Sequence, residues 1–400
     1  MSGLTNELLQ SFDESVGPAT ESRILPPVCY TSPEFFGFEM ESIWSHDWIA
    51  VGREDQIPNP GDFFTLTMAG EPLLVVRGND GATRVLSAVC RHQGMILSDG
   101  SGNCKAFTCP YHLWTYGLDG RLLGAPAMER SVDFDKSEVC LPPLKVETWN
   151  GFVFANFDPD APPLAPTLTG AEQALEHYDL ANAHTIVDDA PVLPWNWKVM
   201  LENFVDGYHA HRLHPFIYDY GPGEGLSFLP TSKDDNHITR FNRQTLKDAS
   251  FNPTLQAVLP VFRNLTDEER MNGLFVLFPP SLALAIQVDQ IVYFMISPRA
   301  ANEIQISIGW LLDPAVRDDP LFQRKFDQIV KPGVMSFVVD DIRTDTMIQI
   351  GLSSRFGPRG RYSWQQESLA QLNRWCVKRY RQFWPGGAVA GARPRAVKSA

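Results

Sequence analysis

The distribution of apolar and polar residues predicts a β-rich segment in the first half of the chain. Short runs of strand-like composition are separated by turn sequences such as Gly78-Asn79-Asp80-Gly81. The expected strands lie at 62–67, 72–77, 83–89 and 151–157. Before them, apolar Phe36, Met40 and Ile43 follow Ser32-Pro33 at helical spacing, which predicts a helix that begins at residue 33.

From residue 167 onward the pattern predicts a mixture of helices and strands. The expected helices lie at 171–178, 196–209 and 363–383. The expected strands lie at 273–278, 282–288, 291–297 and 304–311. Ser363 followed by Gln366 is a capping box, and Pro385 ends the last helix. The predicted fold class is therefore α+β.

The polar, proline-rich segment 158–163 is the clearest candidate for a domain boundary, because ordered patterns lie on both sides of it. We therefore expect five parts. They are an N-terminal segment and helix at 1–44 that pack on the second domain, an all-β domain at 45–157, a linker at 158–166, a second domain at 167–385 and a disordered tail at 386–400.

Composition places the chain among ordinary globular proteins, with 44% hydrophobic and 20% charged residues in a length of 400. The net charge of −13 argues against a nucleic-acid partner, because a phosphate-binding surface needs clustered Lys and Arg. The longest apolar stretch, 273–286, is interrupted by Pro279-Pro280 and is too short to span a bilayer. No secretory signal is visible at 1–21, so a cytoplasmic location is expected.

Two short motifs each combine a cysteine with a histidine. Cys90-Arg91-His92 has the pattern C-x-H, and sixteen residues later Cys109-Pro110-Tyr111-His112 has the pattern C-x-x-H. In a cytoplasmic chain, Cys and His at such spacing are more often metal ligands than disulfide partners. Two thiolates on one iron and two imidazoles on the other would hold a Rieske 2Fe–2S cluster.

A single tetrahedral zinc ion also accepts two Cys and two His, so zinc is the alternative for this site. Zinc fingers usually place both cysteines on one turn and both histidines on a helix. Here each loop carries one of each residue type, and both loops lie among predicted strands. This mixture favours the iron–sulfur cluster.

A second group of candidate ligands lies on the predicted helix at 196–209 and just beyond it. Asp206 and His209 are three residues apart and share a helix face. His209 and His214 are five apart, so a regular helix would separate their directions by about 140°. If both bind one metal ion, the helix must break or distort between them.

The two Cys/His motifs, extended to Gln93-Gly94 and Leu113-Trp114, resemble the Rieske domain of the large subunit of ring-hydroxylating oxygenases. The resemblance covers roughly residues 25–385. It implies that Cys90, His92, Cys109 and His112 bind the cluster. It also implies a helix-grip second domain, in which a curved antiparallel sheet surrounds a long helix and the substrate lies between them.

In this family a D-x-x-H-x-x-x-x-H motif supplies two histidine ligands of a mononuclear Fe(II), which the resemblance places at His209 and His214. A third ligand is an acid that precedes a Gln-x-Gly-Leu sequence, and the offset selects Asp341, with Asp340 and Asp345 as competitors. Two imidazoles and one carboxylate leave positions open for dioxygen.

The resemblance also assigns roles around that iron. Asp206 resembles the family's bridging acid, which links an iron-ligand histidine to the second Rieske histidine of a neighbouring subunit, here His112. Asn203 resembles a residue that lies close to the iron without ordinarily ligating it. A head-to-tail homotrimer would then bring each cluster to the next subunit's iron.

We therefore expect the terminal oxygenase component of a Rieske oxygenase system. It would receive electrons from an NAD(P)H-dependent reductase, with or without a ferredoxin, and use dioxygen to hydroxylate an aromatic or other small organic substrate. The first alternative is oxidative N- or O-demethylation, for example of a quaternary amine. The second is a Rieske electron carrier without oxygenase activity.

Overall fold

The computed structural model of the protein describes residues 3–214 and 219–385. The described chain divides into two compact units, residues 3–43 with 164–385 and residues 44–163. The predicted tail at 386–400 lies outside the described residues. Within the described residues, no helix combines the length and apolar character needed to cross a bilayer.

The unit at 44–163 is built from small antiparallel sheets. One has the strand order β1-β10-β9, another β4-β3-β2-β5 and the third β6-β7-β8. Their strands are β1 (Ile49–Arg53), β2 (Asp62–Met68), β3 (Glu71–Arg77), β4 (Thr83–Ser87), β5 (Ser101–Asn103), β6 (Phe107–Thr108), β7 (Thr115–Tyr116), β8 (Leu122–Gly124), β9 (Lys145–Trp149) and β10 (Phe152–Asn156). The strands expected in this half of the chain are confirmed, although β4 ends two residues earlier than predicted.

The second unit is organised around one antiparallel sheet with the strand order β11-β17-β16-β15-β14-β13-β12. Its strands are β11 (His184–Leu193), β12 (Leu226–Phe228), β13 (Ile238–Arg243), β14 (Asn272–Phe278), β15 (Leu282–Ile286), β16 (Ile291–Ala300) and β17 (Glu303–Leu312). The side chains of β15 are all buried, which is why that segment has no polar alternation. The predicted α+β class is confirmed, whereas β11, β12 and β13 were not expected from the sequence.

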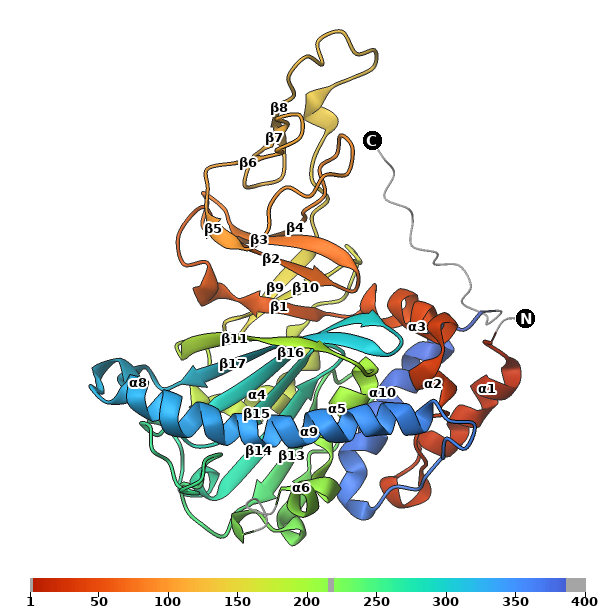
Figure 1. Ribbon diagram of the computed structural model, residues 1–400, viewed down its shortest axis with the longest axis vertical. Helices are drawn as coiled ribbons and strands as arrows, with labels where there is room; N and C mark the ends of the chain where they lie inside the picture. The colour runs from red at the N-terminus through yellow and green to blue at the C-terminus, as the bar shows by residue number, and fades with distance from the viewer. Residues whose placement is uncertain (1–2, 215–218, 386–400) are drawn as a thin grey trace. The chain divides into compact units, whose positions relative to one another are not determined.

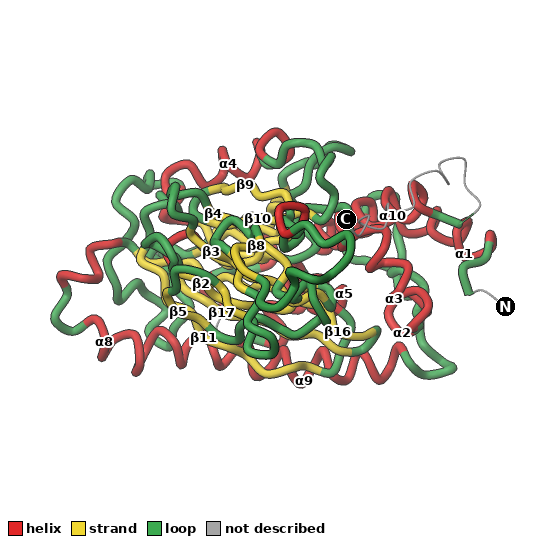
Figure 2. The backbone as a smooth tube through the Cα atoms, turned by 90° about the horizontal axis from the view of Figure 1, so that it is seen from above, coloured by secondary structure: helices red, strands yellow, loops and turns green. Residues whose placement is uncertain are grey.

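The helices described for this unit are α1 (Asn6–Ser11), α2 (Val28–Thr31), α3 (Pro33–Glu39), α4 (Thr169–Leu175), α5 (Trp197–Val205), α6 (Gly207–Leu213), α8 (Phe322–Lys325), α9 (Lys331–Leu352) and α10 (Glu367–Phe383). The long helix α9 runs across one face, and α4 lies on the opposite side (Figures 1 and 2). An antiparallel sheet that holds a long helix is the helix-grip arrangement that the family resemblance implied.

Two predictions about the helices need correction. The segment 196–209 is not one helix, because α5 ends at Val205 and a new helix begins at Gly207. Helix α9 was not predicted at all. Its sequence contains Pro332-Gly333 near the start, and it exposes Val339, Met347 and Ile350 to solvent, so its apolar residues form no single stripe.

A buried ion pair joins the N-terminal segment to the helices beside the sheet. Lys198 of α5 donates to both carboxylate oxygens of Glu39, at 2.7 and 2.8 Å, and both side chains are almost fully buried. Trp197 and Tyr380 donate to the same carboxylate, the indole nitrogen at 3.0 Å. Burial raises the pKa of Glu39, and the charge of Lys198 opposes that rise.

We predict that Lys198→Met destabilises the protein by about 3–5 kcal/mol, because it leaves the Glu39 carboxylate buried without its cation. The midpoint of urea unfolding, followed by tryptophan fluorescence, would measure the loss. Lys247→Met is the control, since the Lys247–Asp267 pair is exposed and should contribute less than about 1 kcal/mol. Equal midpoint shifts in the two variants would contradict the prediction.

Candidate metal centres and the adjoining pocket

The two Cys/His motifs fold into loops with the same backbone hydrogen bonds. The amide of Cys90 donates to the carbonyl of Met95, and the amide of Cys109 donates to the carbonyl of Trp114, both at 2.8 Å. Each cysteine carbonyl accepts from the residue four positions on, Gly94 or Leu113, both at 3.0 Å. The two cysteines therefore hold equivalent positions in their loops, whereas the histidine follows two residues later in the first loop and three residues later in the second.

Both loops require one residue with a left-handed backbone. Gly94 has φ +78°, a value that glycine adopts without strain. Leu113 has φ +59° at the equivalent position and exposes 59% of its surface. A leucine in this conformation is strained, and strained residues of this kind concentrate at functional sites.

The donor atoms of the two loops converge. Nδ1 of His92 lies 3.2 Å from Nδ1 of His112, and the two rings meet edge to face. Cys90 and Cys109 are both buried in the core of the same unit. The hydroxyl of Tyr116 accepts from the amide of Arg91 and lies 3.3 Å from Sγ of Cys90, so its proton is available to the sulfur. Two buried sulfurs and two facing imidazole nitrogens fit a 2Fe–2S cluster with mixed ligands.

A helix break at Asp206 positions the second group of candidate ligands. The Asp206 carboxylate accepts from the amide of Tyr208 at 2.6 Å and so caps α6. His209 then lies in the first turn of α6, and His214 is the residue just after its end, where φ is −112° and ψ is 84°. The distortion predicted between the two histidines is the end of α6 at His214, whereas the break at Asp206, before His209, was not predicted.

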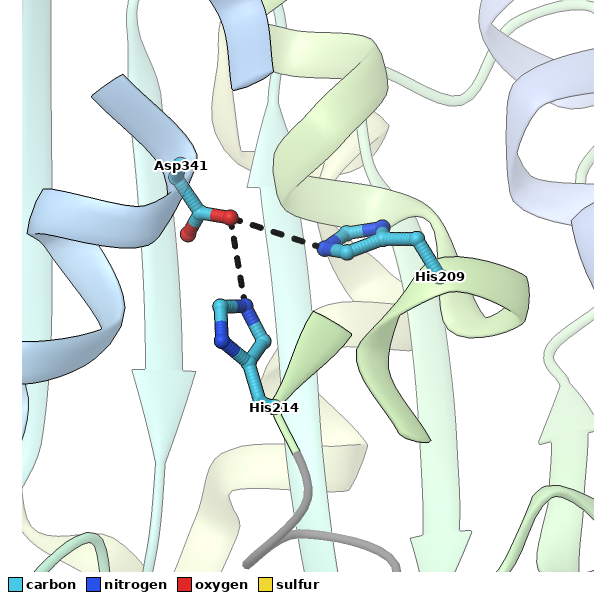
Figure 3. Close-up of side chains that lie close together, drawn as sticks. All are labelled: His209, His214 and Asp341. Carbon is cyan, nitrogen blue, oxygen red and sulfur yellow. Dashed lines mark hydrogen bonds and ion pairs between the residues drawn. The ribbon is translucent and has the colours of Figure 1, made fainter. Parts of the chain in front are cut away.

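Three possible ligand atoms meet where α6 faces α9. Nε2 of His214 lies 3.1 Å from Oδ1 of Asp341, and Nε2 of His209 lies 3.7 Å from the same oxygen (Figure 3). All three ligand atoms lie within 4.8 Å of one another. This donor set, two imidazoles and one carboxylate, fits a mononuclear Fe(II) with open coordination positions.

Acidic and amide groups surround the three residues. Oδ2 of Asp206 lies 3.4 Å from Nδ1 of His209, which directs the other ring nitrogen toward Asp341. Asn203 donates to Asp345 at 2.9 Å and lies 3.4 Å from Asp341.

Of the two competing acids, neither takes the position of Asp341. Asp340 is half exposed and lies 3.6 Å from Nδ1 of His214 rather than from Nε2. Asp345 is fully buried, and that burial, reinforced by the charge of Asp341, raises the pKa of Asp345 well above its usual range.

A cavity of about 110 Å³ adjoins the candidate iron site and is lined by His209, His214 and Asp341 together with α5, α9 and the sheet. Its wall is mainly apolar, and edge-to-face or tilted ring contacts at 5.1–6.0 Å connect one side of it to His214. The rings follow the order Phe294, Phe204, Phe275, Phe251, Phe337 and His214. Such a pocket suits a small organic molecule.

The sequence predicts the candidate ligands that line this pocket, but it identifies no substrate-binding residue among the other side chains of the wall. The aromatic residues were missed because each resembles ordinary core on its own strand or helix. Arg240 on β13 also lines the cavity, and nothing in its local sequence distinguishes it from a surface arginine.

Comparison with protein-family models identifies both units. Residues 47–149 match the Rieske [2Fe-2S] domain, and residues 173–382 match the catalytic domain of ring hydroxylating alpha subunits. The chain therefore belongs to the ring-hydroxylating alpha-subunit family. The Rieske match also decides against the zinc alternative for the Cys/His site.

Individual relatives agree with this family. The chain is 37% identical to the oxygenase subunit of carnitine monooxygenase from Acinetobacter baumannii, over 48% of this chain and 53% of the relative. It is 39% identical to the alpha subunit of chlorobenzene dioxygenase from a Cupriavidus species, over 51% and 46%. These matches span only about half the length of each relative.

A solved structure extends the likeness of fold to most of the chain. A quaternary ammonium Rieske monooxygenase superimposes with a TM-score of 0.75 at 23% identity, over 92% of this chain and 98% of that one. At this identity the likeness shows the shared fold.

We predict that Asp341→Asn lowers the iron content by about one atom per chain, because an amide oxygen is a poorer iron ligand than a carboxylate. The visible absorption of the cluster should persist, since its ligands lie on other loops. Asp340→Asn is the matched control and should keep the wild-type iron content. Elemental analysis would measure both, and iron loss in the Asp340 variant alone would contradict the assignment of Asp341.

Proposed function

We propose that this protein is the oxygenase component of a Rieske oxygenase system that hydroxylates a small organic substrate. The observation that carries the proposal is the meeting of His209, His214 and Asp341 at the wall of an apolar pocket. A Rieske domain in the same chain supports it. A Rieske electron carrier would need neither this pocket nor these residues, so the carrier alternative is disfavoured.

The proposed ligands are Cys90, His92, Cys109 and His112 for the cluster, and His209, His214 and Asp341 for the mononuclear iron. When bound, the cluster supplies single electrons and the mononuclear Fe(II) supplies the site of dioxygen activation. The protein's own part is to orient the ligands and the substrate. Asp206 holds Nδ1 of His209, and the phenylalanine wall excludes water from the bound substrate.

Oxidative demethylation of a quaternary amine is the second candidate reaction. It is supported by relatives that are carnitine and glycine betaine monooxygenases. The row of phenylalanine rings could hold an ammonium group by cation–π attraction as readily as it could hold an aromatic ring. The chlorobenzene dioxygenase relative supports the first candidate, hydroxylation of an aromatic compound.

We further propose a homotrimer in which Asp206 of one copy approaches His112 of the next, with a reductase, directly or through a ferredoxin, as electron donor. Exposed apolar side chains beside His112 and beside Asp206 support a contact between subunits at each of these two positions. Tyr111 and Leu113 beside His112 are about 60% exposed, and Tyr208 beside Asp206 is 40% exposed. Apolar residues grouped beside functional sites favour a protein interface.

Mass spectrometry of products formed under ¹⁸O-labelled dioxygen, with a surrogate reductase and a panel of aromatic and quaternary ammonium substrates, would test the proposed activity. We expect one or two labelled oxygen atoms in a hydroxylated product, or labelled formaldehyde from a demethylated one. Iron content should be about three atoms per chain. Two irons per chain and no labelled product would refute an oxygenase.

We predict that Asp206→Asn lowers turnover roughly 10- to 100-fold while both metal centres remain filled. Asparagine still caps a helix well, so α6 should be preserved, whereas the charge beside His209 is lost. Single-turnover oxidation of the reduced cluster would locate the defect in electron delivery. Wild-type rates with both metals present would contradict the bridging role.

A further inference from the structure

A row of four neighbouring side chains crosses the sheet beneath the pocket. Arg240 of β13 pairs with Phe275 of β14, Phe275 pairs with Ala285 of β15, and Ala285 pairs with Val292 of β16. Residues directly opposite one another on adjacent strands project from the same face. All four line the cavity, so Arg240 belongs to the same wall as the aromatic residues.

The Arg240 side chain is buried without a counter-ion. Only 2% of the residue is exposed, its Cζ lies 3.9 Å from the centre of the Phe275 ring, and Nε has no hydrogen-bond partner. Within residues 3–214 and 219–385, no carboxylate oxygen lies within 4.0 Å of its guanidinium nitrogens. Asp206 acts on it at longer range and is already held by Tyr208, His209 and Gln366.

A buried cation in this state is costly to the folded protein. Burial lowers the pKa of Arg240 to about 10, so the guanidinium remains charged at neutral pH. The contact with Phe275 offsets only part of the lost hydration, because cation–π attraction is weaker than a paired carboxylate. Groups that are retained at such a cost, in a cleft beside a reactive site, are candidates for ligand binding.

We propose that Arg240 binds a carboxylate group of the substrate and thereby restricts this oxygenase to organic acids. The carboxylate would accept hydrogen bonds from the guanidinium, and the apolar part of the molecule would lie along the phenylalanine rings toward His214. This proposal rests on the proposed function, since it assigns the substrate class of the same pocket. A neutral hydrocarbon would leave Arg240 unpaired.

The proposal restricts the substrates of both candidate reactions to compounds that carry a carboxylate. Hydroxylation would apply to an aromatic carboxylic acid, and demethylation would apply to a quaternary ammonium compound that also carries a carboxylate. The two classes share the group that Arg240 would bind and differ at the end that faces His209 and His214. A cation without a carboxylate would be repelled by the guanidinium.

Binding to the metal-loaded protein, measured by calorimetry without dioxygen or reductase, would test the proposal. The probes are two acid–amide pairs of nearly equal shape: 3-phenylpropionate with 3-phenylpropanamide, and γ-butyrobetaine with its amide. We expect one acid to bind roughly 10- to 200-fold more tightly than its amide, the range for a hydrogen bond to a charged group. A preference for 3-phenylpropionate would indicate an aromatic acid as substrate, whereas a preference for γ-butyrobetaine would indicate a quaternary ammonium acid.

Arg240→Gln should abolish this preference and bring the acid to the affinity of its amide, whereas a general packing defect would weaken both equally. Arg240→Lys keeps the charge and should retain part of the preference. Arg243→Gln is the matched control, because it removes the same charge from an exposed position on the same strand.

Equal binding of acid and amide by the wild-type protein would overturn the proposal, even if Arg240→Gln did not fold. So would an acid preference that survives Arg240→Gln. Iron content and labelled-oxygen incorporation are measured separately, so loss of the acid preference would leave the proposed oxygenase activity standing.

Discussion

The candidate iron site depends on one short helix, α6, which Asp206 caps at its start and which ends just before His214. A continuous helix through this segment would give His209 and His214 directions about 140° apart. Because α6 ends at Leu213, His214 lies outside the helical path and meets the ring of His209 edge to face. The Asp206 carboxylate caps the other end of α6. The same carboxylate also lies beside Nδ1 of His209. One acidic side chain therefore determines both the path of the chain and the orientation of a ligand.

The position of Asp206 between α5 and α6 is stabilised because side chains at both ends of α5 form polar contacts with other parts of the unit. At its start, Lys198 forms the buried ion pair with Glu39, which also receives hydrogen bonds from Trp197 and Tyr380. At its end, Asn203 donates to Asp345 on α9, the helix that carries Asp341. A polar contact thus joins α9, which carries the candidate ligand Asp341, to α5, the helix that leads into α6. A site that must hold three donor atoms within a few ångströms requires such support from its surroundings.

Candidate metal ligands could be predicted from the sequence most directly where they are close together along the chain. Cys90 with His92, Cys109 with His112, and His209 with His214 are recognisable because fixed spacing reflects a single loop or turn. Asp341 could be selected only through family resemblance, since helix α9 was not predicted and its run of acids resembles a solvated surface. Arg240 could not be found at all. The role proposed for Arg240 depends on which strands are neighbours and on the lack of a hydrogen-bond partner for its Nε among the described residues, and both are properties of the three-dimensional fold.

The pocket's selectivity depends on the contrast between its apolar walls and Arg240, the one arginine among the described residues that line it. Phenylalanine rings attract aromatic, aliphatic and quaternary ammonium groups alike, so the apolar wall gives affinity with little discrimination. A buried guanidinium acts differently, because any ligand that enters must either neutralise it or leave it without hydration. The energetic difference between those outcomes is larger than the difference between two apolar shapes. Selection among small molecules of similar size would therefore be made at Arg240, while the candidate ligands His209, His214 and Asp341 would determine which end of the molecule reacts.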